Sequence, residues 1–251
     1  MTDKGAYGKW IVGVGRIFLG FPYLAGTLEA RGRERLIANW SAFDCVTFVE
    51  TVLALGACAW DGPVNKTRFR KHLQYLRYRG GAIDGFSSRL HYFNDWISDN
   101  EKKGVVSDVC RSLGADPLRK KISFMTDHRE LYPSLKNETE FQKMLAVEKR
   151  LSRRVFRILD PARSWRRTDG ILSGDIIAFV TNEKGLDIAH VGFALSEGPA
   201  LRLLHASSRE GKVEISQKTL AAYLRASKTF SGVRVVRPRP PFAWRGHGFS
   251  K

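Results

Sequence analysis

The spacing of apolar residues along the chain changes near residue 174, and this change constrains the fold more than any other feature. Before it, apolar residues recur mostly at helical spacing, over residues 8–19, after residue 43, and through most of 66–160. After it come short β-rich segments separated by turn residues, at 175–181, 189–195, 201–207, 212–216 and 233–238. One helix-like segment, at 216–226, precedes the last of them. Short strands with tight connections favour antiparallel pairing. The sequence therefore predicts an α+β fold, with helices packed on an antiparallel sheet.

The length and the ends of the chain set its expected organisation. With 251 residues, 43% of them hydrophobic, the chain can build a full core. We expect one unit over residues 1–240, with a helical insertion at about 60–170, followed by a loosely held basic tail at 241–251. The first 21 residues make a poor signal peptide because Arg16 breaks the apolar run and no small-residue cleavage site follows. No stretch is long enough to predict a transmembrane span.

A strong positive charge predicts contact with polyanions. The chain has 42 Lys and Arg against 25 Asp and Glu, a net charge of +17. Part of it gathers at 149–167, "KRLSRRVFRILDPARSWRR", predicted as a helix with a basic face opposite an apolar stripe of Val147, Leu151, Val155 and Ile158. This face is either merely solvated or makes weak polyanion contacts. Without zinc-finger spacing or an RNP-type strand, no specific nucleic-acid partner is expected.

A cysteine stands where a helix should begin, in "WSAFDCVTFVETVLALGA", residues 40–57. The spacing of the apolar residues after position 42 predicts one buried helical face. Ser41 and Asp44 could form a capping box, or Asp44 could be the N-cap itself; both leave Cys45 in the first turn. The free N–H groups and the helix dipole there favour a thiolate, so Cys45 is a candidate nucleophile. Cys58 and Cys110 are expected to be buried small hydrophobes.

Two histidines on neighbouring predicted strands could supply the base that a thiol nucleophile needs. If "SEGP" is a four-residue hairpin loop, Leu195 pairs with Ala200 and His190 lies directly opposite His205. Directly opposite side chains have Cβ atoms about 4.5–5.5 Å apart, so one imidazole could orient the other.

Two other interpretations of this pair stay open. One histidine could be in the core and the other on the surface. Alternatively, the two could bind zinc, with Asp187 or Cys45 as further ligands.

Taken together, four of these segments resemble a known superfamily. "FDCVTFVE", "SGDIIAFV", "AHVGFAL" and "LLHASS" resemble the NlpC-type cysteine peptidases, papain-like hydrolases of bacterial cell walls. The resemblance implies Cys45 as nucleophile, His190 as base and His205 as the orienting third residue. Tyr23, in "FPYLAGTLE", matches a tyrosine that lies beside the nucleophile.

A closer resemblance covers roughly residues 8 to 238. "PYLAGTLE", "FDCVTFVE", "IDGFSSRLHYFNDWI" and "ELYPSLK" together are similar to the branch of that superfamily that acts as N-acetylmuramoyl-L-alanine amidases. It implies an extracytoplasmic enzyme without a cofactor that cleaves peptidoglycan fragments (muropeptides), with the insertion between Cys45 and His190 walling the cleft. Alternatives are a γ-D-glutamyl-diamino acid endopeptidase with the same triad, acyl transfer by the same thiol, or a non-catalytic basic binding module.

A polar loop in the insertion supplies the candidate substrate contacts. The planar fork of Arg89, in "GFSSRLHYF", suits the carboxylate of a stem peptide. Ser87 and Tyr23 are expected to offer hydroxyl groups to the sugar or lactyl oxygen. The structural alternative is that Arg89 pairs with Asp84 and holds the loop closed.

Overall fold

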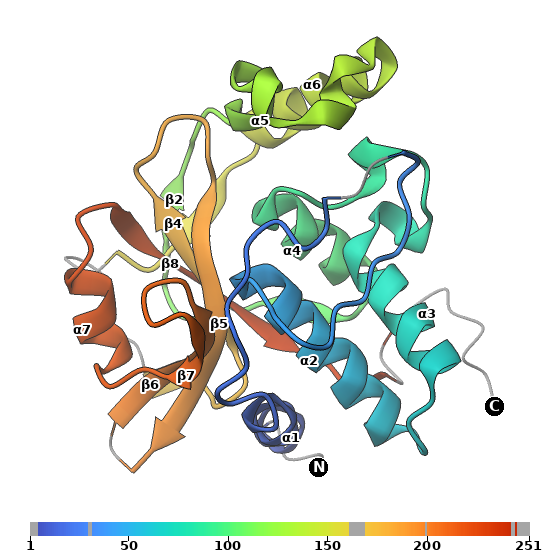
Figure 1. Ribbon diagram of the computed structural model, residues 1–251. Helices are drawn as coiled ribbons and strands as arrows, with labels where there is room; N and C mark the ends of the chain where they lie inside the picture. The colour runs from blue at the N-terminus through green and yellow to red at the C-terminus, as the bar shows by residue number, and fades with distance from the viewer. Residues whose placement is uncertain (1–4, 30–31, 161–168, 199, 242–243, 245–251) are drawn as a thin grey trace.

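The fold is α+β, as the sequence predicts, and is built around one antiparallel sheet (Figure 1). The computed structural model describes residues 5–29, 32–160, 169–198, 200–241 and Trp244. Each strand of the sheet is antiparallel to its neighbours. Its six strands lie in the order β1 (Val106–Asp108), β8 (Phe230–Pro238), β4 (Ile176–Thr181), β5 (Ile188–Glu197), β6 (Ala200–Ser207) and β7 (Lys212–Ile215).

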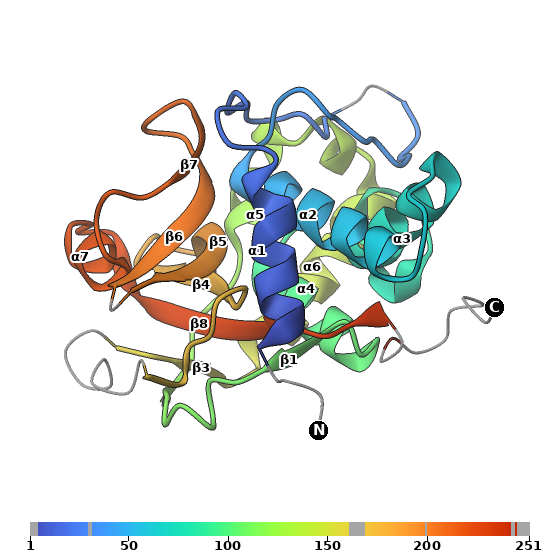
Figure 2. The ribbon, with the colours of Figure 1, turned by 90° about the horizontal axis from the view of Figure 1, so that it is seen from below.

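Helices cover both faces of the sheet, because both faces are apolar. The helices are α1 (Ala6–Arg16), α2 (Cys45–Trp60), α3 (Lys66–Arg77), α4 (Phe93–Lys102), α5 (Phe124–Asp127), α6 (Glu138–Ser152) and α7 (Leu220–Arg225). Val191 and Phe193 of β5 pack into the core with α1 and α2, which lie side by side on one face (Figure 2). Ala194, the alternate residue, packs on the other face with Leu220 and Leu224 of α7.

Helix α2 begins at Cys45 because Asp44 caps it. The Asp44 carboxylate accepts a hydrogen bond from the Thr47 N–H (2.7 Å), and the Thr47 hydroxyl accepts one from the Asp44 N–H (2.9 Å). Asp44 is therefore the N-cap, and Ser41 instead donates to the side chain of Asn39. The helix packs between the sheet and α3, which buries most of its circumference.

The segment 66–160 is less helical than expected. Its strand β1 joins the main sheet, while β2 (Asp116–Leu118) and β3 (Phe156–Ile158) form a separate pair. The other short elements are 3-10 turns, η1 (Arg79–Gly81), η2 (Phe86–Ser88), η3 (Arg129–Leu131) and η4 (Pro133–Lys136). A separate apolar cluster joins η2, α5 and α6. Three-residue strands are too short to show a repeat, so periodicity could not reveal them.

The predicted basic helix ends early. Helix α6 stops at Ser152, Val155 is 46% exposed, and Ile158 lies on β3, so the expected apolar stripe is wrong beyond Leu151. Residues 161–168 of this segment lie outside the described residues.

Most of the tail at 241–251 also lies outside the described residues. Trp244 is described and buried, and its ring packs against Tyr75 and His72 of α3. Within the described part of the chain, no helix combines the length and apolarity that crossing a membrane requires.

Candidate active site

Cys45 is the first residue of α2 and is half-buried as a residue, while its sulfur lies against the backbone of β5. Burial, reinforced by the carboxylate of Asp44, raises the pKa of the Cys45 thiol to about 12. The backbone N–H groups of Val191, Cys45 and Val46 act in the other direction and lower this pKa. The expectation of a resting thiolate is therefore wrong, because desolvation outweighs the helix N-terminus.

His190 and His205 are in contact. Nε2 of His190 lies 2.7 Å from Nδ1 of His205, within hydrogen-bond distance, and the ring planes are nearly perpendicular at 81°. Burial, helped by the neighbouring His205, lowers the pKa of His190 to about 3, and burial lowers the pKa of His205 to about 4. Both imidazoles are therefore neutral at pH 7.

The strand register behind this contact differs from the predicted one by two residues. Glu197 pairs with Ala200, which leaves a two-residue turn instead of four. Side chains alternate along a strand, so a shift of two keeps both rings on one face and makes them diagonal neighbours. Diagonal pairs remain within reach of aromatic rings.

Gly192 provides the space for this diagonal contact, and sequence reasoning missed it. A Cβ at position 192 would lie 2.8 Å from the Cβ of His205 and 2.9 Å from the carbonyl oxygen of Leu204. Any side chain here would displace the strand that carries His205. The sequence signal was a lone glycine inside a strand, which marks a close approach of neighbouring groups.

Two tyrosines border the site. Tyr23 is half-buried, and its pKa is raised by burial and by the nearby Cys45 and Asp44. Tyr223 of α7, which sequence reasoning missed, stacks on His190 with ring centroids 6.2 Å apart. Burial, Glu214 and Cys45 raise the pKa of Tyr223 to about 12. The structure thus brings Tyr23 and Tyr223 near the thiol from opposite ends of the sequence.

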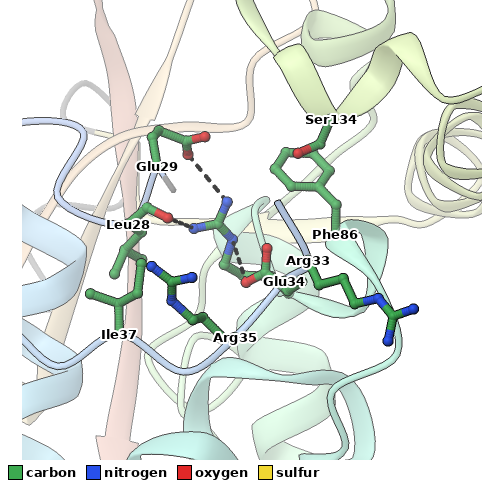
Figure 3. Close-up of a pocket in the computed structure, with 9 residues that line it drawn as sticks. Leu28, Glu29, Arg33, Glu34, Arg35, Ile37, Phe86 and Ser134 are labelled. Carbon is green, nitrogen blue, oxygen red and sulfur yellow. Dashed lines mark hydrogen bonds and ion pairs between the residues drawn. The ribbon is translucent and has the colours of Figure 1, made fainter. Parts of the chain in front are cut away.

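Arg89 is buried against the loop that follows Tyr23. Its guanidinium donates to the Leu28 carbonyl oxygen (3.0 Å) and to Glu29 (3.2 Å), and its Nε lies 3.6 Å from Glu34. Figure 3 shows Leu28, Glu29 and Glu34 gathered around these interactions at a small pocket. The alternative pairing with Asp84 is wrong, because Asp84 pairs with Lys143 of α6.

Ser87 is also buried, and its backbone N–H donates to Glu140 of α6 (2.7 Å). Among the contacts of the described residues, no hydrogen bond or ion pair joins Ser87 or Arg89 to Cys45 or to the two histidines. The structure therefore shows two separate polar groups, one at the start of α2 and one around Arg89.

Asp187, the further ligand in the zinc interpretation, is engaged elsewhere. Its carboxylate accepts hydrogen bonds from the N–H groups of Asn94 (2.7 Å) and Ile188 (2.7 Å), while burial raises its pKa to about 6. No three His, Cys, Asp or Glu side chains of the described residues are grouped to hold a metal ion.

Comparison with known proteins identifies the family of the chain. The family model described as AmiA-like, N-acetylmuramoyl-L-alanine amidase-like, covers residues 13–232. The chain belongs to this family. No curated protein sequence matches the chain.

Solved structures agree in fold. An N-acetylmuramoyl-L-alanine amidase from Bacteroides uniformis is 38% identical, with a TM-score of 0.87 over 94% of this chain and 100% of that one. A Bacteroides fragilis protein provisionally described as a xylanase is 40% identical, with a TM-score of 0.83 over 90% of this chain and 99% of that one. A Legionella pneumophila protein at 24% identity shares the fold, with a TM-score of 0.67 over 93% of this chain and 89% of that one.

Proposed function

We propose that this chain is a cysteine amidase that hydrolyses the bond between N-acetylmuramic acid and L-alanine in muropeptides. The chain belongs to the amidase-like family, and one observation carries the proposal. His190 and His205 are in contact next to the stretch of β5 backbone against which the Cys45 sulfur lies. A thiol, a base and a group that orients the base are the parts that covalent acyl transfer needs.

The reaction starts from neutral groups. His190 donates its Nε2–H to Nδ1 of His205, which leaves Nδ1 of His190 unprotonated and available as a base. As the Cys45 sulfur attacks the lactyl carbonyl carbon, its proton passes to this nitrogen. The proton then goes to the leaving alanine amine as the C–N bond breaks. Water, activated by His190, hydrolyses the thioester and releases the muramic acid carboxylate.

The backbone at the start of α2 supplies the stabilisation of the oxyanion. The N–H of Cys45 points to the helix N-terminal side, where a negative oxygen is favoured. The Tyr23 hydroxyl is the second donor in this proposal. In other hydrolases, removal of one oxyanion donor lowers the stabilisation of the transition state by about 3–4 kcal/mol.

Substrate recognition is assigned to Arg89, Ser87 and Tyr23. Arg89 borders the small pocket of Figure 3, which Arg33, Arg35, Glu29 and Glu34 also line. The arginines outnumber the glutamates, and this excess of positive charge favours a carboxylate of the stem peptide. Ser87 and Tyr23 offer hydroxyl groups to the sugar or to the lactyl oxygen.

The test is the product pattern from a defined muramoyl tetrapeptide with a diamino acid at its third position. Mass spectrometry should find the intact tetrapeptide and free N-acetylmuramic acid, and no product with the Cys45→Ala variant. A stem peptide shortened between D-glutamate and the diamino acid would make the chain an endopeptidase. Binding to polyanions without turnover by the parent protein would make it a basic binding module.

A further inference from the structure

A carboxylate lies on the far side of His205 from His190. Glu214 of β7 is the direct cross-strand partner of His205, and one of its oxygens is 3.6 Å from Nε2 of His205. His205 is fully buried, and this Nε2 atom has no hydrogen-bond partner among the described residues. His190, His205 and Glu214 thus form a row across three adjacent strands, β5, β6 and β7.

The row allows only two arrangements of protons when both imidazoles are neutral. In the first, His190 donates from Nε2 to Nδ1 of His205, and His205 carries its own proton on Nε2, toward Glu214. In the second, His205 donates from Nδ1, so His190 must carry its proton on Nδ1. The second arrangement turns the lone pair of His205 Nε2 toward the carboxylate, and it removes the lone pair with which His190 would accept a proton.

We propose that Glu214 is a positioning residue that selects the first arrangement and so keeps Nδ1 of His190 free to act as the base. This inference rests on the proposed function. A carboxylate 3.6 Å away attracts an N–H and repels a lone pair, although the separation is longer than a hydrogen bond. Such contacts are often long without substrate and shorten in the complex.

The surroundings of Glu214 allow it to act in this way. Burial and Glu210 raise its pKa, whereas a hydrogen bond from the Ser207 hydroxyl and the charge of Lys212 favour the carboxylate form. Glu214 also lines a cavity of about 460 Å³ with Tyr223, which itself contacts both imidazole rings.

The experiment compares Glu214→Met, Glu214→Asp and the matched control Glu210→Gln, a carboxylate of the same hairpin that is 51% exposed and outside the row. Because Glu210 raises the pKa of Glu214, its replacement favours the Glu214 carboxylate and should leave the row as in the parent protein. The first readout is the imidazole nitrogen spectrum by ¹⁵N NMR at pH 7, which distinguishes protonated from unprotonated ring nitrogens. In the parent protein and in Glu210→Gln, Nδ1 of His190 should be unprotonated. In Glu214→Met a second tautomer should appear, and Glu214→Asp should restore part of the parent spectrum.

The second readout is turnover of the muramoyl tetrapeptide. Because the base itself contributes about 10²–10⁴-fold, loss of its tautomer should lower kcat about tenfold in Glu214→Met with KM little changed. A parent spectrum with Nδ1 of His190 protonated, or an unchanged spectrum in Glu214→Met, overturns the inference. If the parent protein shows no amidase turnover, the proposed function fails, while the spectra still decide whether Glu214 sets the tautomer.

Discussion

Two polar groups of the molecule differ in how burial affects their charge. In the group of Cys45, His190 and His205, burial raises the pKa of the thiol and lowers the pKa values of the imidazoles, so all three are neutral. In the group of Arg89, Glu29 and Glu34, opposite charges lie within 3.6 Å of one another and offset the cost of burial.

The difference separates groups that can exchange protons from groups that hold position. A neutral thiol beside a neutral imidazole can give up its proton as the sulfur attacks a substrate carbonyl, because the new bond to carbon spares the sulfur a buried negative charge. The guanidinium of Arg89 is instead held in place by the Leu28 carbonyl oxygen and by the carboxylates of Glu29 and Glu34. The first group therefore suits chemistry, and the second suits a fixed wall held together by ion pairs.

Replacement of the nucleophile should have the largest effect. Cys45→Ala should remove turnover of the muramoyl tetrapeptide, a loss of at least about 10³-fold, because no other group can form the thioester. The melting temperature should change little, since Cys45 is half-buried and lies at the very start of α2. Cys58→Ala, on the same helix but fully buried, is the control and should lower the melting temperature while turnover persists. Full turnover in Cys45→Ala would end the assignment.

The two histidines should not be equivalent. His190→Ala should cost about 10²–10⁴-fold in kcat, because it removes the base. His205→Ala should cost less, since the base remains and only its tautomer and orientation are lost. Single-turnover rates measure both, with His128→Ala of the insertion as the control. An equal or greater loss in His205→Ala would mean that the roles are reversed or that both histidines bind a metal.

The neutral state of the thiol predicts a particular pH dependence of alkylation. With the pKa of Cys45 raised to about 12, iodoacetamide should react slowly at pH 7, and the rate should rise about tenfold per pH unit as the thiolate forms. Rates between pH 6 and pH 9, followed by intact-protein mass, give the profile, and Cys45→Ala corrects for Cys58 and Cys110. A plateau that begins below pH 7 would reveal a low-pKa thiolate and break the contrast between the two groups.

The smallest expected effect concerns Arg89. Arg89→Lys keeps the charge but loses the planar fork, so it should slow a substrate with a free stem carboxylate more than the matching amide. Steady-state kinetics on the two substrates and a thermal melt measure the effect. Equal losses on both substrates, or a melting temperature several degrees lower, would make the role of Arg89 structural only. The difference between the group of Cys45 and the group of Arg89 would then be larger.

Local signals made part of this architecture predictable. Asp44 as the N-cap was one of the two helix starts that the sequence allowed, and both put Cys45 in the first turn of α2. The β-rich segments after residue 174 likewise become β4 to β8. Side chains alternate between the two faces along these strands. An error of two residues in the predicted register therefore still leaves His190 and His205 on the same face and in contact.

The rest depends on tertiary packing that the sequence does not show. The pKa of Cys45 is set by how completely the folded chain removes water from the sulfur, which no local pattern measures. Tyr223 and Glu214 reach the histidines only because α7 and β7 fold back on β6. The partners of Arg89 lie about sixty positions earlier in the chain, beyond any short-range motif.

The most direct test of the account is the mass of the acyl-enzyme trapped by acid quench during turnover of the muramoyl tetrapeptide. The account predicts a thioester on Cys45 whose added mass equals the N-acetylmuramoyl group alone, absent from Cys45→Ala. An adduct heavier by alanine and glutamate would show cleavage within the stem peptide. An adduct on another residue, or turnover that passes through no adduct in any quench, would contradict the assignment of Cys45 as the nucleophile.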